Sequence, residues 1–267
     1  KAHNLEVGGS NPSPATKIIM KNLIKFLDKN ILFGVLSYFY KKILFYKSRK
    51  FLNNYPNYFI YSKQSLKNPI AILCEKYGSD KGGSKYTWSE RKNHFYSSYY
   101  YELFKDKKEK IKLIFECGIG TNDENIQANM TKYGKPGASL RVFRDYFLNA
   151  KIYGADIDKN ILFTSDRIFT YYVDQLDEIS ILSMWNKIKI NCFDIIIDDG
   201  MHDLEASFNL FKFSFSKLRK GGIYIIEDVN ISYLIQLAKK LNKFNPKIIS
   251  SSKKNNIDDY LFVIEKF

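Results

Sequence analysis

FDIIIDDGMHD, residues 193–203, is the stretch that decides the fold of this chain. A run of three isoleucines stops at two adjacent aspartates, followed by a glycine and a histidine. A short apolar run bounded in this way is typical of a buried parallel strand. In parallel sheets ligands bind beyond the carboxyl ends of the strands, so we expect Asp198, Asp199 and His202 to lie at a functional site.

Short apolar runs and segments with helical spacing alternate on both sides of this stretch, and two more runs close the chain as a hairpin. We predict strands at 111–118, 150–158, 167–175, 193–199, 223–229, 246–252 and 258–267. We predict helices at 70–77, from Ser89 onward, and at 136–150, 176–189, 204–222 and 231–244. This order predicts an α/β fold, a doubly wound and mostly parallel seven-stranded Rossmann-like sheet with an N-terminal helical extension.

The N-terminal part has a different composition. We expect 1–19 to be a non-native leader, since GGSNPSPATK looks like a translated tRNA gene end, with the natural start at Met20. Residues 20–69 form a basic, aromatic extension, and 70–267 form the main domain. Within the extension, 20–50 predicts an amphipathic helix that either packs on protein or lies on an anionic membrane surface. Its loop-like end, 53–69, contains two prolines and several asparagines.

Charge is unevenly distributed along the chain. The net charge is +14, yet residues 111–200 hold 10 Lys and Arg against 13 Asp and Glu. Residues 1–70 hold 12 Lys and Arg against 2 Asp and Glu. A nucleic-acid groove on the main domain is therefore not expected, although AT-rich codon usage would also enrich lysine. The three cysteines form no Cys-x-x-Cys pair, which favours a reducing, cytoplasmic location, with the inner membrane surface as an alternative.

Each predicted parallel strand ends at one or more acidic residues. Residues 116–121, ECGIGT, contain Gly118 and Gly120, which let the backbone approach a ligand closely. Asp123 stands where a dinucleotide fingerprint has its third glycine, so an uncharged or cationic cofactor fits better than a pyrophosphate. Asp156 is placed to accept hydrogen bonds from ribose hydroxyls, and the following strand end is suited to a base contact. The candidate cofactor-binding residues here are Glu116, Gly118, Gly120, Asp156, Asp174, Gln175 and Asp198.

These features together resemble class I S-adenosylmethionine-dependent methyltransferases across roughly residues 77–267. The motifs YGSDK, PGASLR, YGADID, VDQ, DDGMH and IED are similar to those of bacterial macrocin- and mycinamicin-type sugar O-methyltransferases. PGASLR, RDYF and YGADID also resemble methyltransferases of capsular O-methyl phosphoramidate pathways. The resemblance implies S-adenosylmethionine as cofactor. The long insertion before the helix at 136–150 is expected to fold over its methionine end, with Ser139 near its carboxylate and Tyr77 and Lys81 closing the other side.

The same resemblance implies a metal and a base. Carried over, the ligands of Mg²⁺ are Asp199, Glu227 and Asp228, and the base is His202, with Asp199 also counted as catalytic. Adjacent strands lie about 4.8 Å apart, so carboxylates at their ends can converge on one hard cation. The alternative is that Asp199 and Asp228 only cap the helices that follow them.

The acceptor is open at this point. A phosphate or phosphoramidate group of a capsule precursor and a sugar hydroxyl of a glycan or glycosylated metabolite both suit this set of residues. We expect a small-molecule or glycan-precursor partner and no nucleic acid. Peripheral membrane contact through 20–50 and a homo-oligomer are further expectations, and a nucleic-acid methyltransferase and a non-enzymatic membrane module are the rival classes.

Overall fold

The structure is a computed structural model that describes residues 34, 36–40, 42–61, 65–83, 94, 96–132, 134–250 and 260–267. The chain divides into two compact units, Lys1–Lys47 and Ser48–Phe267. In the first unit, 36–40 and 42–47 are helical, which confirms a helical extension over that part. The expected leader and Met20 lie outside the described residues. No described helix has the length and apolarity that crossing a membrane needs.

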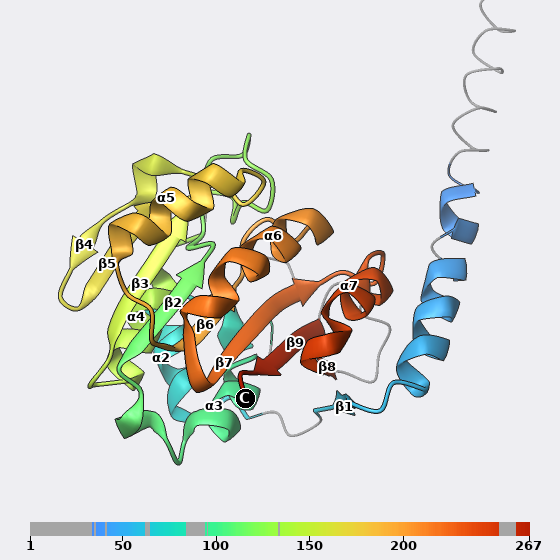
Figure 1. The fold of residues 1–267 in the computed structure, drawn as a ribbon, viewed down its shortest axis with the longest axis horizontal. Coiled ribbons are helices and arrows are strands. Elements are labelled where there is room, and N and C mark those ends of the chain that lie inside the picture. Colours follow the sequence, from blue (N-terminus) through green and yellow to red (C-terminus); the bar gives the residue numbers. More distant parts are fainter. Residues whose placement is uncertain are drawn as a thin grey trace, which may run out of the picture. The chain divides into compact units, whose positions relative to one another are not determined.

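One sheet organises the second unit (Figure 1). Among the described residues its order is β1-β8-β9-β7-β6-β2-β3-β5-β4. The strands are β1 (Tyr58–Ile60), β2 (Leu113–Cys117), β3 (Lys151–Asp156), β4 (Thr164–Ser165), β5 (Ile168–Tyr172), β6 (Phe193–Asp198), β7 (Leu218–Val229), β8 (Lys247–Ser250) and β9 (Tyr260–Glu265). β9 is antiparallel to β7 and β8, and β4 is antiparallel to β5, while the other pairs are parallel.

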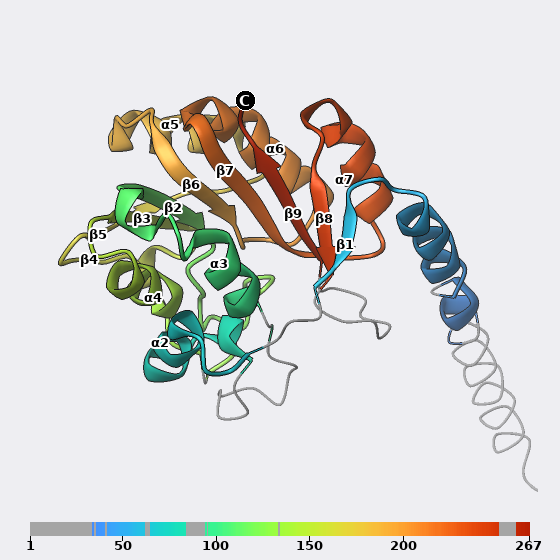
Figure 2. The same ribbon diagram turned by 90° about the horizontal axis from the view of Figure 1, so that it is seen from below.

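Helices cover both faces of this sheet. They are α2 (Pro69–Tyr77), α3 (Tyr96–Phe104), α4 (Ala138–Tyr146), α5 (Glu178–Ile188), α6 (Leu204–Ser214) and α7 (Leu234–Leu241), with short 3₁₀ turns including η1 (Asp80–Gly82). Figure 2 shows α5, α6 and α7 on one face and α2, α3 and α4 on the other. Every residue of β6 is buried, because a central parallel strand is covered on both sides. The predicted doubly wound fold is confirmed.

The sheet is wider than predicted. Seven strands match the expected set, and two more, β1 and β4, are added at the edges. β1 falls within 53–69, which the sequence indicated as a loop because of its prolines and asparagines. The backbone of Tyr58, Phe59 and Ile60 pairs in parallel with β8 instead. Long-range pairing has therefore outweighed the local turn composition.

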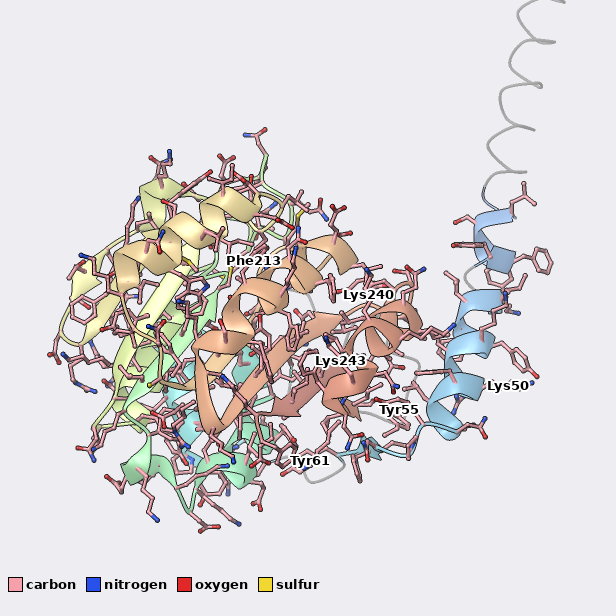
Figure 3. The ribbon with its side chains drawn as sticks, in the orientation of Figure 1. Lys50, Tyr55, Tyr61, Phe213, Lys240 and Lys243 are labelled. Carbon is pink, nitrogen blue, oxygen red and sulfur yellow. The ribbon has the colours of Figure 1, made fainter. Side chains whose placement is uncertain are left out.

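The segment before α2 also belongs to the second unit. The Ser48 hydroxyl donates a hydrogen bond to the Ile231 carbonyl at 3.3 Å. Tyr55 and Tyr61, labelled in Figure 3, donate to the carbonyls of Pro246 at 3.1 Å and Ser98 at 3.0 Å. The second compact unit thus begins at Ser48, and the domain boundary after residue 69 stays a prediction.

The predicted helix at 204–222 is too long. α6 ends at Ser214, and residues from Leu218 onward are already part of β7. Leu218 pairs with Phe193, and the register shifts before the next pair of residues. A Cβ on Gly222 would lie 3.0 Å from the Phe193 carbonyl, so this glycine permits close strand approach rather than ending the helix.

Candidate active site

The carboxyl ends of β2, β3, β6 and β7 meet at one edge of the sheet. Cys117 is level with Ala155 of β3 and with Asp198 of β6, and Asp198 is level with Ile226 of β7. The acidic residues next to these positions are consequently neighbours in space, as the sequence predicted. Four of them, Glu116, Asp156, Asp198 and Glu227, are almost completely buried.

The glycine turn after β2 lies against the loop after β6. Gly118 has φ +84°, and a Cβ there would lie 2.0 Å from the Asp199 carbonyl oxygen. The Asp199 amide in turn donates to the Cys117 carbonyl at 2.8 Å. Only glycine suits this combination of positive φ and close backbone contact. The turn expected to hold the cofactor and the loop expected to hold the metal are therefore contiguous.

The insertion that follows the glycine turn folds back on it. Met130 donates its amide hydrogen to the Thr121 carbonyl at 2.8 Å, and Gly137 donates to the Ile119 carbonyl at 2.7 Å. A Cβ on Gly120, which has φ +85°, would lie 2.1 Å from the Met130 methyl carbon. Met130 thus occupies the space directly over Gly120.

Asp156 is bound by backbone donors. Its Oδ2 accepts from the Ile119 amide at 2.9 Å and its Oδ1 from the Asp158 amide at 3.0 Å. Burial raises the pKa of Asp156, and these hydrogen bonds offset part of that rise. In this structure the carboxylate fixes the shape of the glycine turn. The expected ribose contact stays a prediction.

Gln175 is also used within the protein. Its Nε2 donates to Asp198 Oδ1 at 2.7 Å, and its Oε1 accepts from the Met201 amide at 2.8 Å. A Cβ on Gly200 would lie 2.0 Å from Gln175 Oε1, so the loop closes tightly around this amide. Asp174 forms a local turn by accepting from the Leu176 amide at 2.9 Å. Gln175 thus holds the loop that carries Asp199, and the expected contact of Asp174 and Gln175 with a base stays a prediction.

A buried lysine lies at the centre of the acids. Lys81 Nζ is 2.5 Å from Asp199 Oδ2, 2.6 Å from Glu227 Oε2 and 3.4 Å from Glu116 Oε1. The residue is only 4% exposed. Burial alone would lower the pKa of Lys81, but the nearby carboxylates raise it well above its ordinary value. We call Lys81, Glu116, Asp199 and Glu227 the Lys81 cluster.

The outer oxygens of the cluster have hydroxyl donors. Ser139 donates to Glu116 Oε2 at 2.5 Å, and the Tyr100 hydroxyl donates to Glu227 Oε1. Burial raises the pKa of Glu116 to about 7, although Lys81 and Ser139 act in the opposite direction. Ser139, expected near a cofactor carboxylate, is thus bonded to a carboxylate of the protein itself.

The other oxygen of Asp199 faces a histidine. His202 Nε2 lies 3.3 Å from Asp199 Oδ1 and 3.8 Å from Asp228 Oδ2, and these three residues form the His202 group. Burial lowers the pKa of His202, but the two aspartates outweigh it and raise that pKa to about 9. His202 and Asp228 have φ of +55° and +50°, a backbone strain that is common at functional sites.

Two residues that the sequence did not indicate complete the surroundings of Asp228. Tyr96 donates to Asp228 Oδ1 at 2.5 Å, and His94 Nδ1 lies 3.4 Å from the same oxygen. Tyr96 and Tyr100 are four apart on α3, so both point from one helix face at the acids. This i, i+4 spacing was the available signal, but aromatic side chains at that spacing more often fill a core.

Tyr77 lies apart from both groups. Its hydroxyl donates to Asp145 on α4 and accepts from Arg144 at 3.2 Å. The structure therefore brings Lys81 into the acidic site but joins Tyr77 to the surface of α4. The expectation that Tyr77 and Lys81 close one side of a cofactor site stays a prediction.

The donor atoms suit a cation in two places. Asp199, His202 and Asp228 can each offer a ligand atom within 4.8 Å of the others, and so can Glu116, Asp199 and Glu227. Carboxylate oxygens are the ligands that Mg²⁺ prefers, so the residues fit such an ion. The predicted triad of Asp199, Glu227 and Asp228 is thereby divided between two groups that share Asp199.

The strand order matches a known fold. The central strands β8-β9-β7-β6-β2-β3-β5, with a glycine turn after β2, form the Rossmann-like fold of class I S-adenosylmethionine-dependent methyltransferases. In the solved structures, MycE methyltransferase from the mycinamycin biosynthetic pathway, in complex with Mg and SAH, matches with TM-score 0.55 and 22% identity. The match covers 77% of this chain and 56% of that one.

Curated relatives narrow the resemblance. The chain is 30% identical to 8-demethyl-8-alpha-L-rhamnosyl tetracenomycin-C 2'-O-methyltransferase of Streptomyces olivaceus, over 61% of this chain and 38% of the relative. It is 30% identical to demethylmacrocin O-methyltransferase of Streptomyces fradiae, over 63% of this chain and 38% of the relative. The mycinamicin VI 2''-O-methyltransferase of Micromonospora griseorubida gives the same figures, 30%, 63% and 38%.

The match spans 38% of the length of these curated relatives. No protein family model matches the chain. The resemblance to macrocin- and mycinamicin-type sugar O-methyltransferases, which the motifs indicated, is nevertheless confirmed by sequence and by fold.

Proposed function

We propose that the chain is an S-adenosylmethionine-dependent O-methyltransferase that acts on a sugar hydroxyl of a glycan precursor or glycosylated metabolite. The observation that carries the proposal is the contact between the Gly118 turn and the Asp199 loop. A methyl donor bound at the turn would lie directly beside the His202 group. Methyl transfer is an in-line displacement, so aligning donor and acceptor is the main task of such a site.

The donor site is assigned to the strand ends around the glycine turn. Gly118 and Gly120 supply close backbone approach, while Asp156 holds the turn and Asp198 ends the neighbouring strand. The adjacent acids favour a cofactor without net negative phosphate charge, which fits the sulfonium of S-adenosylmethionine. Met130 lies over Gly120 and would have to contact such a cofactor or move aside.

The acceptor site is assigned to the His202 group. Asp199 and Asp228 would hold Mg²⁺, and a bound Mg²⁺ lowers the pKa of a hydroxyl that it contacts. His202 Nε2 would take the hydroxyl proton. In the structure the two aspartates favour the protonated form of His202, with a pKa of about 9. With Mg²⁺ held by the two aspartates, the pKa of His202 would fall, and its imidazole could then accept the proton.

The sugar hydroxyl is favoured over a phosphorylated acceptor. The relatives reported above are named for O-methylation of demethylmacrocin, mycinamicin VI or a rhamnosyl tetracenomycin-C. None of those names supports the phosphate or phosphoramidate group that the capsule-pathway resemblance indicated, and that acceptor now serves as the alternative in the test. The cytoplasmic location, membrane contact through 20–50 and a homo-oligomer stay predictions.

The test uses labelled S-adenosylmethionine with two sets of acceptors. One set contains glycosylated metabolites that have free sugar hydroxyls and no phosphate, and the other contains phosphorylated glycan precursors whose sugar hydroxyls are blocked. We expect label transfer to the first set, loss of transfer in EDTA and recovery on adding Mg²⁺. Transfer to the second set alone would replace the proposed acceptor, and full activity in EDTA would exclude the metal requirement.

A further inference from the structure

Lys81 is placed by its own local structure and does not reach the acids by chance. It lies in η1, which follows α2 directly, and the amides of Gly78 and Ser79 both donate to the Cys74 carbonyl, at 2.8 and 2.9 Å. A Cβ on Gly82 would lie 2.6 Å from the Cys74 Cβ, so this turn packs closely on α2. The lysine backbone is therefore fixed at the point from which Nζ reaches the acids.

The three carboxylates around the ammonium come from three different elements. Glu116 belongs to β2, Glu227 to β7, and Asp199 follows β6. Glu116 and Glu227 are at most 1% exposed, so water does not solvate their charges. Buried carboxylates are stable only when they are paired and hydrogen-bonded, and the Lys81 ammonium supplies the shared positive charge.

Asp199 links the Lys81 cluster to the His202 group, because it belongs to both. Its Oδ2 is held at 2.5 Å by Lys81, which leaves Oδ1 directed at His202, 3.3 Å away. Glu227 is engaged at both oxygens, by Lys81 and by Tyr100. Asp228, in contrast, has an oxygen on the His202 side.

We propose that the Lys81 ammonium is a fixed cation of the site, paired with Glu116, Asp199 and Glu227, which confines an exchangeable divalent cation to the side of Asp199 and Asp228. Lys81 is then a positioning residue, and Glu227 serves Lys81 rather than the metal. The inference rests on the proposed function for the metal itself, but the pairing of Lys81 with the three acids does not depend on methyl transfer.

The test compares the parent chain with Lys81→Met, without cofactor or acceptor. Losing the ammonium leaves three buried carboxylates that a divalent cation can take over. We expect the Tm of Lys81→Met to fall by about 10 °C or more in EDTA, and to recover mostly in saturating Mg²⁺. Mn²⁺ binding, measured by electron paramagnetic resonance, should increase by one ion per chain relative to the parent.

Two further variants keep the test decisive. Lys81→Met combined with Glu227→Gln has one acid fewer, so it should regain stability in EDTA and lose the additional Mn²⁺ ion. Lys76→Met removes an exposed lysine of α2 that pairs with Asp145 of α4, and it should change neither the Mn²⁺ count nor the Mg²⁺ dependence of the Tm.

The outcomes separate this inference from the proposed function. The proposal that Lys81 is a fixed cation would be overturned if Lys81→Met binds no additional Mn²⁺ and its Tm does not recover in Mg²⁺. It would also be overturned if the double variant folds and binds as many Mn²⁺ ions as Lys81→Met. If the parent chain binds no Mn²⁺ and Lys81→Met binds one Mn²⁺ ion, the result supports Lys81 as a fixed cation. The same result removes the metal from the proposed function.

Discussion

The acids at the sheet edge form two regions that are balanced in different ways. Asp156 and Asp198 accept hydrogen bonds from neutral donors, namely backbone amides and the Gln175 side chain. The acids of the Lys81 cluster and the His202 group face a lysine and histidines. The acids of the first region hold a turn through hydrogen bonds from uncharged groups. The acids of the second region are balanced by positively charged side chains.

This difference indicates which acidic residues we expect to take part in the reaction. A carboxylate whose lone pairs are taken by backbone amides is part of the scaffold, because moving those amides would deform the fold. A carboxylate that shares a cation can exchange its partner for a metal or a proton. The acidic strand ends, equivalent in the sequence, therefore differ in their contacts, and we expect them to differ in function.

The largest expected effect is at His202. His202→Ala removes the proposed base and should lower turnover about 100-fold or more, because general base catalysis contributes at least that much. The affinity for S-adenosylmethionine, measured by calorimetry, should stay within about threefold of the parent, because His202 is assigned to the acceptor site. A threefold change in affinity corresponds to less than about 1 kcal/mol. Turnover equal to that of the parent would remove His202 from the mechanism.

The next effect tests the contact between the regions. Gly118→Ala puts a Cβ 2.0 Å from the Asp199 carbonyl at φ +84°, so we expect the free energy of unfolding to fall by about 2–4 kcal/mol. Gly34→Ala is the matched control, because Gly34 is helical and a Cβ there has no heavy atom within 4 Å. Urea unfolding should show little loss or a slight gain for Gly34→Ala. Equal losses in the two variants would refute the tight contact.

The smallest effect concerns a charged group outside both regions. Tyr77, Arg144 and Lys76 donate to Asp145 and, against the effect of burial, lower its pKa to about 2. The folded pKa is below the unfolded one, so the stabilisation is present above about pH 4 and is lost as the pH falls toward 2.

Asp145→Asn should accordingly destabilise the chain at pH 7 by less than about 1 kcal/mol, as expected for a partly exposed pair. The difference between parent and variant should shrink at pH 3 in urea unfolding experiments. A difference that is the same at both pH values would show that charge is not its cause.

The sequence predicted the central sheet because its signals are local. Short apolar runs marked the strands, and helical spacing marked the segments between them, so the acidic ends fell at one edge as expected. β1 and the start of β7 were missed, since both depend on pairing with distant residues, such as Leu218 with Phe193. The pairing of distant strands overrides local composition in these two places.

The site was predictable in its members more than in its contacts. Asp199, His202 and Asp228 are together, as the motifs indicated. The partners of Lys81 lie 118 and 146 residues away from it, and no local pattern relates them. The contact between Gln175 and Asp198 was not predicted for the same reason, because Asp198 belongs to another strand.

The most direct test of the difference between the two regions compares Asp156→Asn with Asp199→Asn. Calorimetry gives the affinity for S-adenosylmethionine, and label transfer at saturating cofactor gives turnover. Asp156→Asn should weaken cofactor binding about tenfold or more, because a charged hydrogen-bond acceptor of the glycine turn is lost. Asp199→Asn should leave the affinity within about threefold and reduce turnover about 100-fold or more. If Asp199→Asn weakens cofactor binding as much as Asp156→Asn does and leaves turnover intact, the division between scaffold and chemistry is contradicted.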